Sequence, residues 1–211
     1  RARLPGRSGP PRRRGVGGAR EAGCGVIVAG IDPSLTSTGV AVVDTQDRLT
    51  IATHTVASKG RRDASWRERW ERGVDLAADI GALVPHDSEL VVVEAPTLSQ
   101  GRQGGHLDRH GLWWALYGNL TRAGHDVLVV PASSRAKYAT GRGNAGKDEV
   151  ILAVSRRYPQ APIVNNDQAD AVALAAMGAR LLGEPVEDAL PKAHLAALAK
   201  LALPTSGPSQ A

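Results

Sequence analysis

Four acidic residues of this 211-residue chain stand where secondary structure should begin or end. Asp32 ends the apolar run GVIVAGID, and Glu94 ends the apolar run ELVVVE just before Ala-Pro. Asp167 and Asp170 open the helix-like segment NNDQADAVALAAM three residues apart, so their side chains share one helix face. Converging carboxylates repel one another, and all-oxygen ligands select hard cations such as Mg²⁺ or Mn²⁺. The pattern therefore favours a divalent-metal site.

Each acid also has an ordinary structural explanation. Asp32 precedes a proline and fits a turn, and Glu94 fits a solvated strand end. Asp167 fits a first-turn acid, which the helix dipole favours. Asp170 is harder to explain in this way, because it begins an almost entirely apolar helix. Taken together, the four acids nevertheless favour a common site, because each lies at the end of an element that could face the same cleft.

Hydrophobic periodicity predicts the elements that would position these acids. Apolar and β-branched runs predict five strands, at 25–32, 39–44, 49–56, 89–96 and 125–132. Helical spacing predicts helices at 63–84, 106–123, 133–140, 146–157 and 167–182, followed by a weaker helix at 187–202. In the first helix the apolar residues at helical spacing are Trp66, Trp70, Val74, Ala77, Ala78, Ile80 and Leu83.

The connections between the strands indicate how they are arranged. The first three are joined by tight connections, which is typical of an antiparallel meander. The run at 89–96 does not alternate, so we expect a central strand covered on both faces. If the helix at 63–84 makes a crossover, Asp32 and Glu94 emerge at one edge, where α/β sheets usually bind ligands. We predict an α/β fold with a mixed five-stranded sheet, a three-stranded antiparallel meander plus two parallel strands, flanked by helices.

The net charge of +5 is unevenly distributed. Residues 1–25 contain seven Arg and one acid and are rich in Pro and Gly, so we expect a disordered extension, either merely solvated or a nucleic-acid-binding arm. It lacks the apolar stretch of a secretory leader. Residues 102–157 carry nine basic residues against four acids, which is compatible with a phosphate-binding surface and also with solvated helix faces. We expect one domain at 26–183, then a C-terminal helix and polar tail at 184–211.

The composition excludes several classes of site and of protein. Cys24 is the only cysteine, which rules out an internal disulfide and a cysteine-based zinc site. No apolar run reaches the roughly 18 residues of a membrane span. We therefore expect a globular, cytoplasmic protein without membrane contact.

Four motifs, taken in order, are similar to those of one family. GIDPSLTSTGVAVVD, VVVEAP, GNAGKDEV and NNDQADAVALAAM resemble the ordered motifs of RuvC-type Holliday junction resolvases, which have an RNase H-like fold. The tail PKAHLAALAKLALP resembles that of short phage and actinobacterial members. The resemblance spans about residues 26–182. It implies a crossover junction endodeoxyribonuclease, a metal-dependent hydrolase that resolves four-way DNA junctions by paired cuts in recombination and repair.

The resemblance also implies roles for individual residues. The catalytic metal ligands would be Asp32, Glu94, Asp167 and Asp170, holding two Mg²⁺ ions, for which Mn²⁺ would substitute. Lys147 would contact the reacting phosphate as part of the catalytic site. The DNA-binding residues would be Lys137, Lys147, Arg102 and Arg142. Because the family pairs its subunits through the helix HLDRHGLWWALYGNL, Trp113 and Trp114 are candidates for a homodimer interface, although both cannot easily point into one core.

One position departs from the pattern of the family. Its best-known bacterial members have an aromatic residue three positions after the second acid, where it stacks at the centre of the junction, and this chain has Thr97. Without that aromatic residue we expect no such stacking, and a range of substrates that extends to flaps and other branched DNA. Two alternatives to the resolvase stay open: a nuclease of the same fold that acts on flaps, other branched DNA or RNA–DNA hybrids, and a module that binds branched DNA without cutting it.

Two further motifs suggest other functions but lack the context these require. GRGNAGKD at 141–148 nearly matches a nucleotide phosphate-binding loop, but Asp148 replaces the hydroxyl residue that would bind the metal. GIDPSLTSTG also resembles the phosphate loop of actin-like and sugar-kinase folds, which need a second, related half. Residues 110–211 contain no second loop of that kind.

Overall fold

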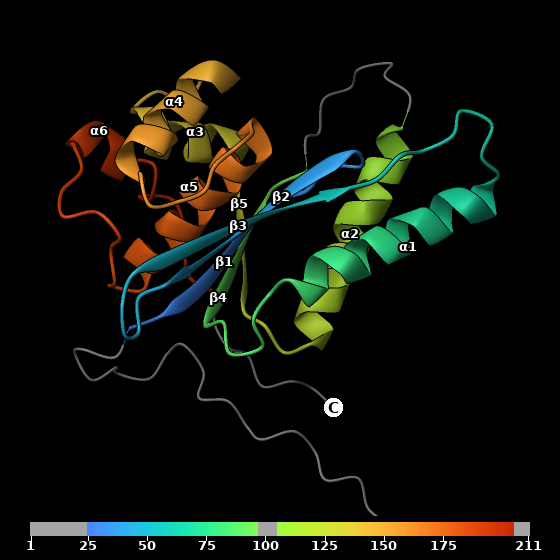
Figure 1. Ribbon diagram of the computed structural model, residues 1–211, viewed down its shortest axis with the longest axis horizontal. Coiled ribbons are helices and arrows are strands. Elements are labelled where there is room, and N and C mark those ends of the chain that lie inside the picture. Colours follow the sequence, from blue (N-terminus) through green and yellow to red (C-terminus); the bar gives the residue numbers. More distant parts are fainter. Residues whose placement is uncertain (1–24, 97–104, 205–211) are drawn as a thin grey trace, which may run out of the picture.

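Helices cover both faces of a five-stranded sheet (Figure 1). The computed structural model describes residues 25–96 and 105–204, so nearly all of the predicted N-terminal extension and the end of the polar tail lie outside it. The strands are β1 (Ile27–Asp32), β2 (Ser37–Asp44), β3 (Thr50–Ala57), β4 (Leu90–Glu94) and β5 (Val127–Val130). Their order in the sheet is β3-β2-β1-β4-β5.

The predicted arrangement of the strands is confirmed. β1 pairs with β2, and β2 with β3, in antiparallel orientation. β4 lies parallel to both β1 and β5. The crossover from β3 to β4 runs through the helix α1 (Trp66–Ala82), as the prediction required. The mixed α/β sheet therefore joins an antiparallel meander to two parallel strands.

The helices are divided between the two faces of the sheet (Figure 1). α1 and α2 (His106–Arg122) pack against each other on one face. The other face carries α3 (Ala132–Thr140), α4 (Lys147–Arg157), α5 (Asn166–Leu181) and the short α6 (Lys192–Leu195). Within the described ranges, no helix combines the length and apolarity needed to cross a bilayer.

Each face of the sheet has its own hydrophobic core. Successive side chains of β4 point to opposite faces, so Leu90 and Val92 join the core formed with α5, whereas Val91 and Val93 join the core formed with α1 and α2. All four side chains are fully or almost fully buried. β4 is therefore a central strand covered on both faces, which explains why its sequence is continuously apolar.

Two glycines allow α5 to lie directly on the sheet. A Cβ atom at Gly30 in β1 would come within 2.2 Å of the carbonyl oxygen of Ala171, and one at Gly39 in β2 within 1.9 Å of the carbonyl oxygen of Asp167. Because both contacts are with backbone, a side chain at either position would push the helix away from the strands. The close approach buries most of α5 and brings its first turn to the edge where β1 ends.

The apolar face predicted for α1 is only partly correct. Its buried residues are Leu76, Ala77 and Ile80, whereas Trp66 and Trp70 are 71 % and 64 % exposed. The first half of the helix extends away from the sheet, so its helical periodicity continues where no core covers it (Figure 1).

The helix predicted at 187–202 is much shorter in the structure, because α6 spans only four residues. The preceding segment is irregular, and its Glu187 side chain accepts hydrogen bonds from the hydroxyl groups of Tyr138 and Tyr158. These two contacts fix the Glu187 side chain within the irregular segment that precedes α6. Four leucines of the C-terminal segment pack against the core on the α5 side: Leu190, Leu198, Leu201 and Leu203. The predicted domain division at residue 183 stays a prediction.

Candidate active site

Asp32 and Glu94 emerge side by side at one edge of the sheet. β1 and β4 are parallel, and Ile31 lies opposite Val93 in their register, so the residues that follow are neighbours. On its other side Asp32 lies opposite Gly39 of β2, the residue that makes room for α5. The sheet therefore brings two of the four predicted acids together.

α5 brings Asp167 and Asp170 to the same edge. Asn165 caps the helix, because its side-chain oxygen accepts a hydrogen bond from the backbone N–H of Gln168 at 2.9 Å. The Ser37 hydroxyl, at the start of β2, donates a hydrogen bond to Oδ2 of Asp167 at 2.5 Å. The position of the Asp167 carboxylate is thus fixed by both the helix and the strand beneath it.

Arg135 of α3 connects two of the four acids. Its Nε donates a hydrogen bond to Oε2 of Glu94 at 2.6 Å, and its Nη1 donates one to Oδ1 of Asp170. The side chains of Arg135, Glu94 and Asp170 are only 11 %, 12 % and 6 % exposed. Trp113 donates from Nε1 to the Glu94 carbonyl at 2.8 Å and so fixes the end of β4. The buried guanidinium of Arg135 therefore forms ion pairs with one carboxylate from the sheet, Glu94, and one from a helix, Asp170.

Negative charge is in surplus at this edge. Burial raises the pKa of Asp32 well above its usual value, and the carboxylates of Glu94 and Asp170 raise it further. Burial also raises the pKa of Asp170 to about 6, although Arg135 and Lys147 act in the opposite direction. Burial is the largest cause of both shifts, and repulsion from neighbouring carboxylates adds to it.

The predicted DNA-binding residues lie in different surroundings. Lys147 begins α4 and is close enough to Asp170 to lower the pKa of that carboxyl group. Lys137 is half-buried on α3, and its side chain forms no hydrogen bond or ion pair within the described part of the chain. Arg142 forms an exposed ion pair with Glu149 at 2.6 Å. Two other positions with predicted effects lie outside the described residues: Thr97 and Arg102.

The two tryptophans predicted at a subunit interface have opposite surroundings. Trp113 is 7 % exposed and belongs to the core under α1 and α2, whereas Trp114 is 63 % exposed. The Trp113 ring is therefore unavailable to a partner, and its predicted interface role is corrected to a structural one. Trp114 remains a predicted residue of the homodimer interface.

The donor set suits a hard divalent cation, although the acids are not yet arranged as a coordination site. Within residues 25–96 and 105–204, no three His, Cys, Asp or Glu side chains stand in positions that could hold a metal ion. Arg135 engages oxygens of both Glu94 and Asp170. Carboxylate oxygens and surplus negative charge are what Mg²⁺ and Mn²⁺ require. Binding of such an ion therefore requires these two acids to exchange the guanidinium for the metal.

Curated nucleases align with most of this chain. The crossover junction endodeoxyribonuclease RuvC of Synechococcus sp. strain WH7803 is 30 % identical over 161 residues, and that of strain CC9311 is 28 % identical over 173 residues. Each alignment covers 72 % of this chain and 96 % of the relative. The chain belongs to the RuvC family. No family model matches it.

Solved structures of a RuvC protein have the same fold. The Thermus thermophilus RuvC structure aligns with a TM-score of 0.57 and 24 % identity, covering 75 % of this chain and 97 % of that one. T. thermophilus RuvC in complex with a Holliday junction substrate aligns with a TM-score of 0.53 and 25 % identity, covering 71 % and 90 %. The five-stranded mixed sheet with its flanking helices is thus the RNase H-like fold that the resemblance implies.

Sequence reasoning missed two residues of this RuvC-family site, Arg135 and Ser37. Arg135 is one of nine basic residues in a broad segment, and Ser37 is one of several small polar residues in a turn. A signal for Arg135 was available, because it shares a helix face with Tyr138 and Ala139, which are fully buried. A cation on a buried helix face needs an acidic partner. For Ser37 the sequence offered no comparable signal.

Proposed function

We propose that this chain is a metal-dependent endonuclease that resolves four-way DNA junctions by paired hydrolysis of phosphodiester bonds, in recombination and repair. The cluster of four carboxylates at the end of β1 carries the proposal, because its surplus charge disfavours the metal-free state and suits a site that binds cations. The family supports it. The curated relatives are named crossover junction endodeoxyribonucleases, and one solved RuvC holds a Holliday junction substrate.

The proposed metal ligands are Asp32, Glu94, Asp167 and Asp170. We propose that they hold two divalent ions, Mg²⁺ or in its place Mn²⁺. Such ions lower the pKa of water and offset the negative charge that develops on a phosphate during its hydrolysis. The chain itself positions the acids: the parallel pair β1 and β4 fixes two of them, and α5 fixes the other two. Ser37 orients Asp167 through its hydrogen bond.

Basic side chains would bind the substrate around this centre. Lys147 lies at the start of α4, near enough to influence Asp170, so it is placed to contact a non-bridging oxygen of the reacting phosphate. Lys137, Arg142 and Arg102 are proposed to contact phosphates farther along the DNA. Such contacts would fix the register of the substrate without reading its sequence.

We propose that a second copy of the chain packs against α1 and α2. Paired cuts across a symmetric junction need two active sites, which a two-fold dimer supplies. Four large apolar side chains are exposed on these two helices: Trp66, Trp70, Leu107 and Trp114. Single exposed apolar residues are common, but a group of this size on adjacent helices is typical of an interaction surface.

The dimer proposal predicts the effect of Trp114→Ala. Removing this exposed indole should weaken self-association by about tenfold or more, because tryptophans are often the anchors of interfaces. Sedimentation velocity over a series of protein concentrations measures the change. Leu152→Ala is the matched control, since Leu152 is 51 % exposed on α4, on the other face of the sheet. A wild-type protein that stays monomeric throughout would contradict the proposal.

Cleavage of a labelled four-way junction tests the function directly. In Mg²⁺ we expect paired nicks in strands of the same polarity, lost in EDTA, with linear duplex and flap substrates as comparisons. Asp32→Asn should lower the cleavage rate by about a thousandfold or more, because a metal ligand is lost. Asp126→Asn is the control. Burial also raises the pKa of Asp126, but this residue precedes β5, whereas Asp32 and Glu94 lie at the other end of the parallel strands.

Other outcomes would assign a different function. Junctions that are bound but never cut, in either Mg²⁺ or Mn²⁺, would leave only a binding module. Equal cutting of junctions and flaps would retain the catalytic site and remove its specificity for four-way junctions.

A further inference from the structure

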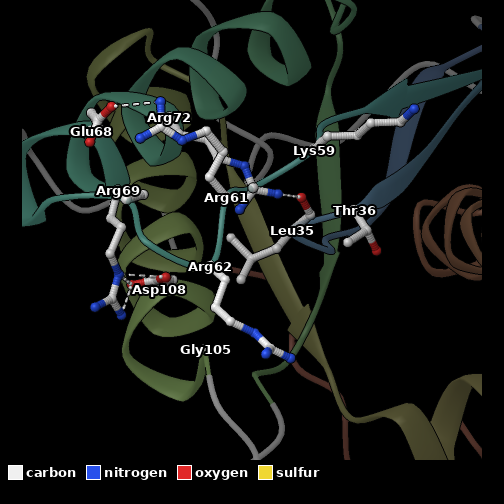
Figure 2. A pocket seen from close by; sticks show the side chains of 12 residues that line it. Leu35, Thr36, Lys59, Arg61, Arg62, Glu68, Arg69, Arg72, Gly105 and Asp108 are labelled. Carbon is white, nitrogen blue, oxygen red and sulfur yellow. Dashed lines mark hydrogen bonds and ion pairs between the residues drawn. The ribbon is translucent and has the colours of Figure 1, made fainter.

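A cavity of about 800 Å³ lies on the α1 and α2 side of the sheet (Figure 2). Its walls come from Leu35 and Thr36, from the segment that joins β3 to α1, and from the first turns of α1 and α2. Leu35 and Thr36 belong to the turn that begins directly after Asp32, and the next residue, Ser37, binds Asp167. One short turn therefore contributes to both the cavity and the acid cluster.

Cationic side chains dominate the lining of this cavity. Five are basic: Lys59, Arg61, Arg62, Arg69 and Arg72. Two are acidic: Glu68 and Asp108. The acids neutralise two of the cations, since Arg69 forms a bidentate pair with Asp108 at 2.7 to 3.0 Å and Arg61 pairs with Glu68 at 3.4 Å. Three positive charges of the lining are left without an acidic partner among the described residues.

Arg72 is a fixed charge at this site. Its Nε donates a hydrogen bond to the Ser58 hydroxyl at 2.8 Å, and its Nη2 donates to the carbonyl oxygens of Leu35 and, at 3.2 Å, of Ser58. These acceptors are uncharged, so they hold the guanidinium in place without neutralising it. Gly60 lies so close that a Cβ atom there would be 2.4 Å from Nη1 of Arg72. The connecting segment therefore packs directly against a positively charged group.

Lys59 and Arg62 are accessible charges of the lining that lack an acidic partner among the described residues. Both are exposed, and within the described residues neither side chain forms a hydrogen bond or an ion pair. In Figure 2 they extend away from the Arg69–Asp108 pair, on the side of Leu35 and Thr36. Two free cations beside a fixed one suit a ligand that presents several anionic oxygens, such as a chain of phosphates.

We propose that this cavity binds backbone phosphates of the DNA substrate, on the stretch of strand that continues past the scissile phosphate over the turn after Asp32. The inference rests on the proposed function, because a phosphodiester held by the acid cluster must continue into its neighbouring nucleotides. The Ser58 N–H donates to the Thr36 carbonyl at 3.1 Å, and Arg72 donates to the Leu35 carbonyl. The cavity is thus attached to the turn that carries the catalytic edge.

The test is the salt dependence of DNA binding by the double variant Lys59→Ala/Arg62→Ala, in the full chain with Asp32→Asn to prevent cleavage. Fluorescence anisotropy would be measured with a four-way junction and with linear duplex over a series of KCl concentrations. If both side chains contact phosphates, the slope of log affinity against log salt should fall by about 2, with a loss of about tenfold in affinity at moderate salt. Arg72 is left unchanged because it also holds the turn.

A matched control removes the same charge elsewhere. Arg48 and Lys200 are exposed and do not line the cavity, so Arg48→Ala/Lys200→Ala should leave the salt slope within error of the parent protein. Equal slopes for the two double variants would overturn the inference, because the loss would then reflect net charge alone. Thermal melting of each variant should be unchanged, since the substituted side chains are exposed.

A second arm distinguishes nucleic acid from a small anion. Inorganic phosphate would be titrated into the parent protein and into Lys59→Ala/Arg62→Ala by calorimetry. Binding of phosphate that is lost in the variant, together with an unchanged DNA slope, would identify a small-anion site and overturn the proposal. A wild-type protein that neither prefers nor cuts junctions would overturn the proposed function instead, and the duplex slopes would still decide whether the cavity binds DNA.

Discussion

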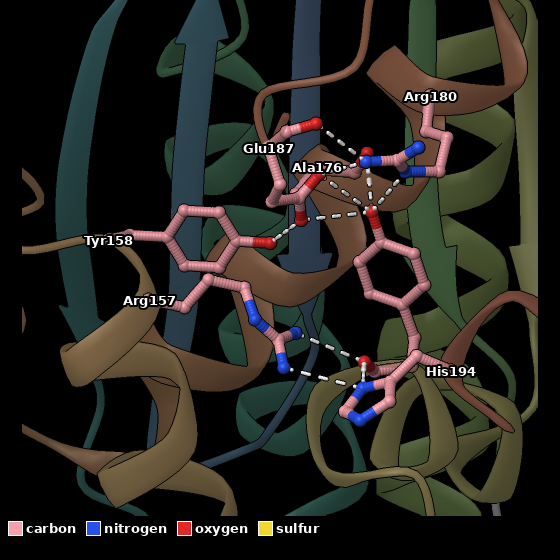
Figure 3. A network of polar contacts seen from close by, with 7 residues as sticks. Arg157, Tyr158, Ala176, Arg180, Glu187 and His194 are labelled. Carbon is pink, nitrogen blue, oxygen red and sulfur yellow. Dashed lines mark hydrogen bonds and ion pairs between the residues drawn. The ribbon is translucent and has the colours of Figure 1, made fainter. Parts of the chain in front are cut away.

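Two buried clusters of arginine and carboxylate lie on the α5 side of the sheet, and α5 contributes to both. Near its start, Asp170 shares Arg135 with Glu94, and two further acids lie at the same edge. Near its end, Arg180 donates hydrogen bonds to both the side chain and the carbonyl of Glu187 at 2.9 Å (Figure 3). The first cluster has more acids than cations, and the second has one of each.

The balanced cluster satisfies its polar groups from several elements. Glu187 accepts hydrogen bonds from the hydroxyls of Tyr138 and Tyr158 as well as from Arg180. Burial raises the pKa of both tyrosines, so both stay protonated and can donate. Nearby, His194 and Arg157 bond to the Tyr138 carbonyl at 2.7 and 3.1 Å (Figure 3). This cluster attaches the C-terminal segment to α3, α4 and α5.

The two clusters differ in how their charges affect stability. In the balanced cluster every charge is paired and hydrogen-bonded, so removing one member leaves an unpaired buried group. At the proposed active site, burial and neighbouring carboxylates both disfavour the ionised acids, so neutralising one of them removes a buried charge and relieves repulsion. Stability measurements should therefore respond in opposite directions at the two clusters.

The largest expected loss of stability follows from Glu187→Gln. The variant keeps the shape of the side chain but leaves Arg180 as an uncompensated buried charge, which should lower the free energy of unfolding by about 3 kcal/mol. Urea denaturation measures the change. The matched control is Glu149→Gln, whose exposed pair with Arg142 should contribute less than about 1 kcal/mol. Junction cleavage by the folded fraction of Glu187→Gln should stay at the wild-type rate, and a selective loss of cleavage would contradict a purely structural role.

Asp170→Asn should have the opposite effect on stability, and the effect should depend on pH. The pKa of this carboxyl is about 6 in the folded chain, against about 4 in an unfolded one, so folding favours the protonated form. Between these two pH values the folded state binds more protons than the unfolded state. The free energy of unfolding therefore falls as the pH rises. The difference corresponds to about 3 kcal/mol.

In EDTA, wild type and Asp170→Asn should therefore be equally stable near about pH 4, and the variant should be more stable by up to about 3 kcal/mol above about pH 7. Urea denaturation across this range measures the difference, and adding Mg²⁺ should reduce it by stabilising only the wild type. A difference that does not change with pH would contradict a raised pKa for Asp170 in the folded chain.

Arg135→Gln should change the affinity of the protein for a divalent metal ion. In the metal-free protein the guanidinium competes with a metal ion for oxygens of Glu94 and Asp170. Its removal should tighten Mn²⁺ binding by about tenfold, the equivalent of about 1.4 kcal/mol, as measured by calorimetry without DNA. Arg142→Gln removes the same charge from an exposed pair and should leave Mn²⁺ binding nearly unchanged. Weaker binding in Arg135→Gln would mean that this residue organises the ligands.

Local patterns in the sequence were sufficient to predict the sheet. Hydrophobic periodicity and short connections reflect interactions between nearby residues, so they indicated the five strands, the meander and the central position of β4. The positions of the four acids at strand and helix ends were predicted for the same reason, because the ends of strands and helices depend mainly on nearby residues. The exposed half of α1 was predicted as core because periodicity does not report whether another element covers it.

Contacts between distant residues were beyond the reach of such patterns. Arg135 reaches Glu94 and Asp170 across 41 and 35 positions of the chain, and Ser37 reaches Asp167 across 130. Glu187, in the irregular segment before α6, accepts a hydrogen bond from Tyr138, 49 positions away in the chain. No local signal specifies these pairs, because each depends on how several elements pack.

The sequence by itself therefore determined which chemistry this chain carries: four carboxylates at the ends of elements, in an order that resembles one family of nucleases. The tertiary structure alone decided which charges meet. It joined Arg135 to the acids and paired Glu187 with Arg180. It also placed Lys59 and Arg62 beside a cavity, where neither has a partner in the described part of the chain. The physical reason is that the type of a side chain is set locally, whereas its electrostatic environment is the sum of everything folded around it.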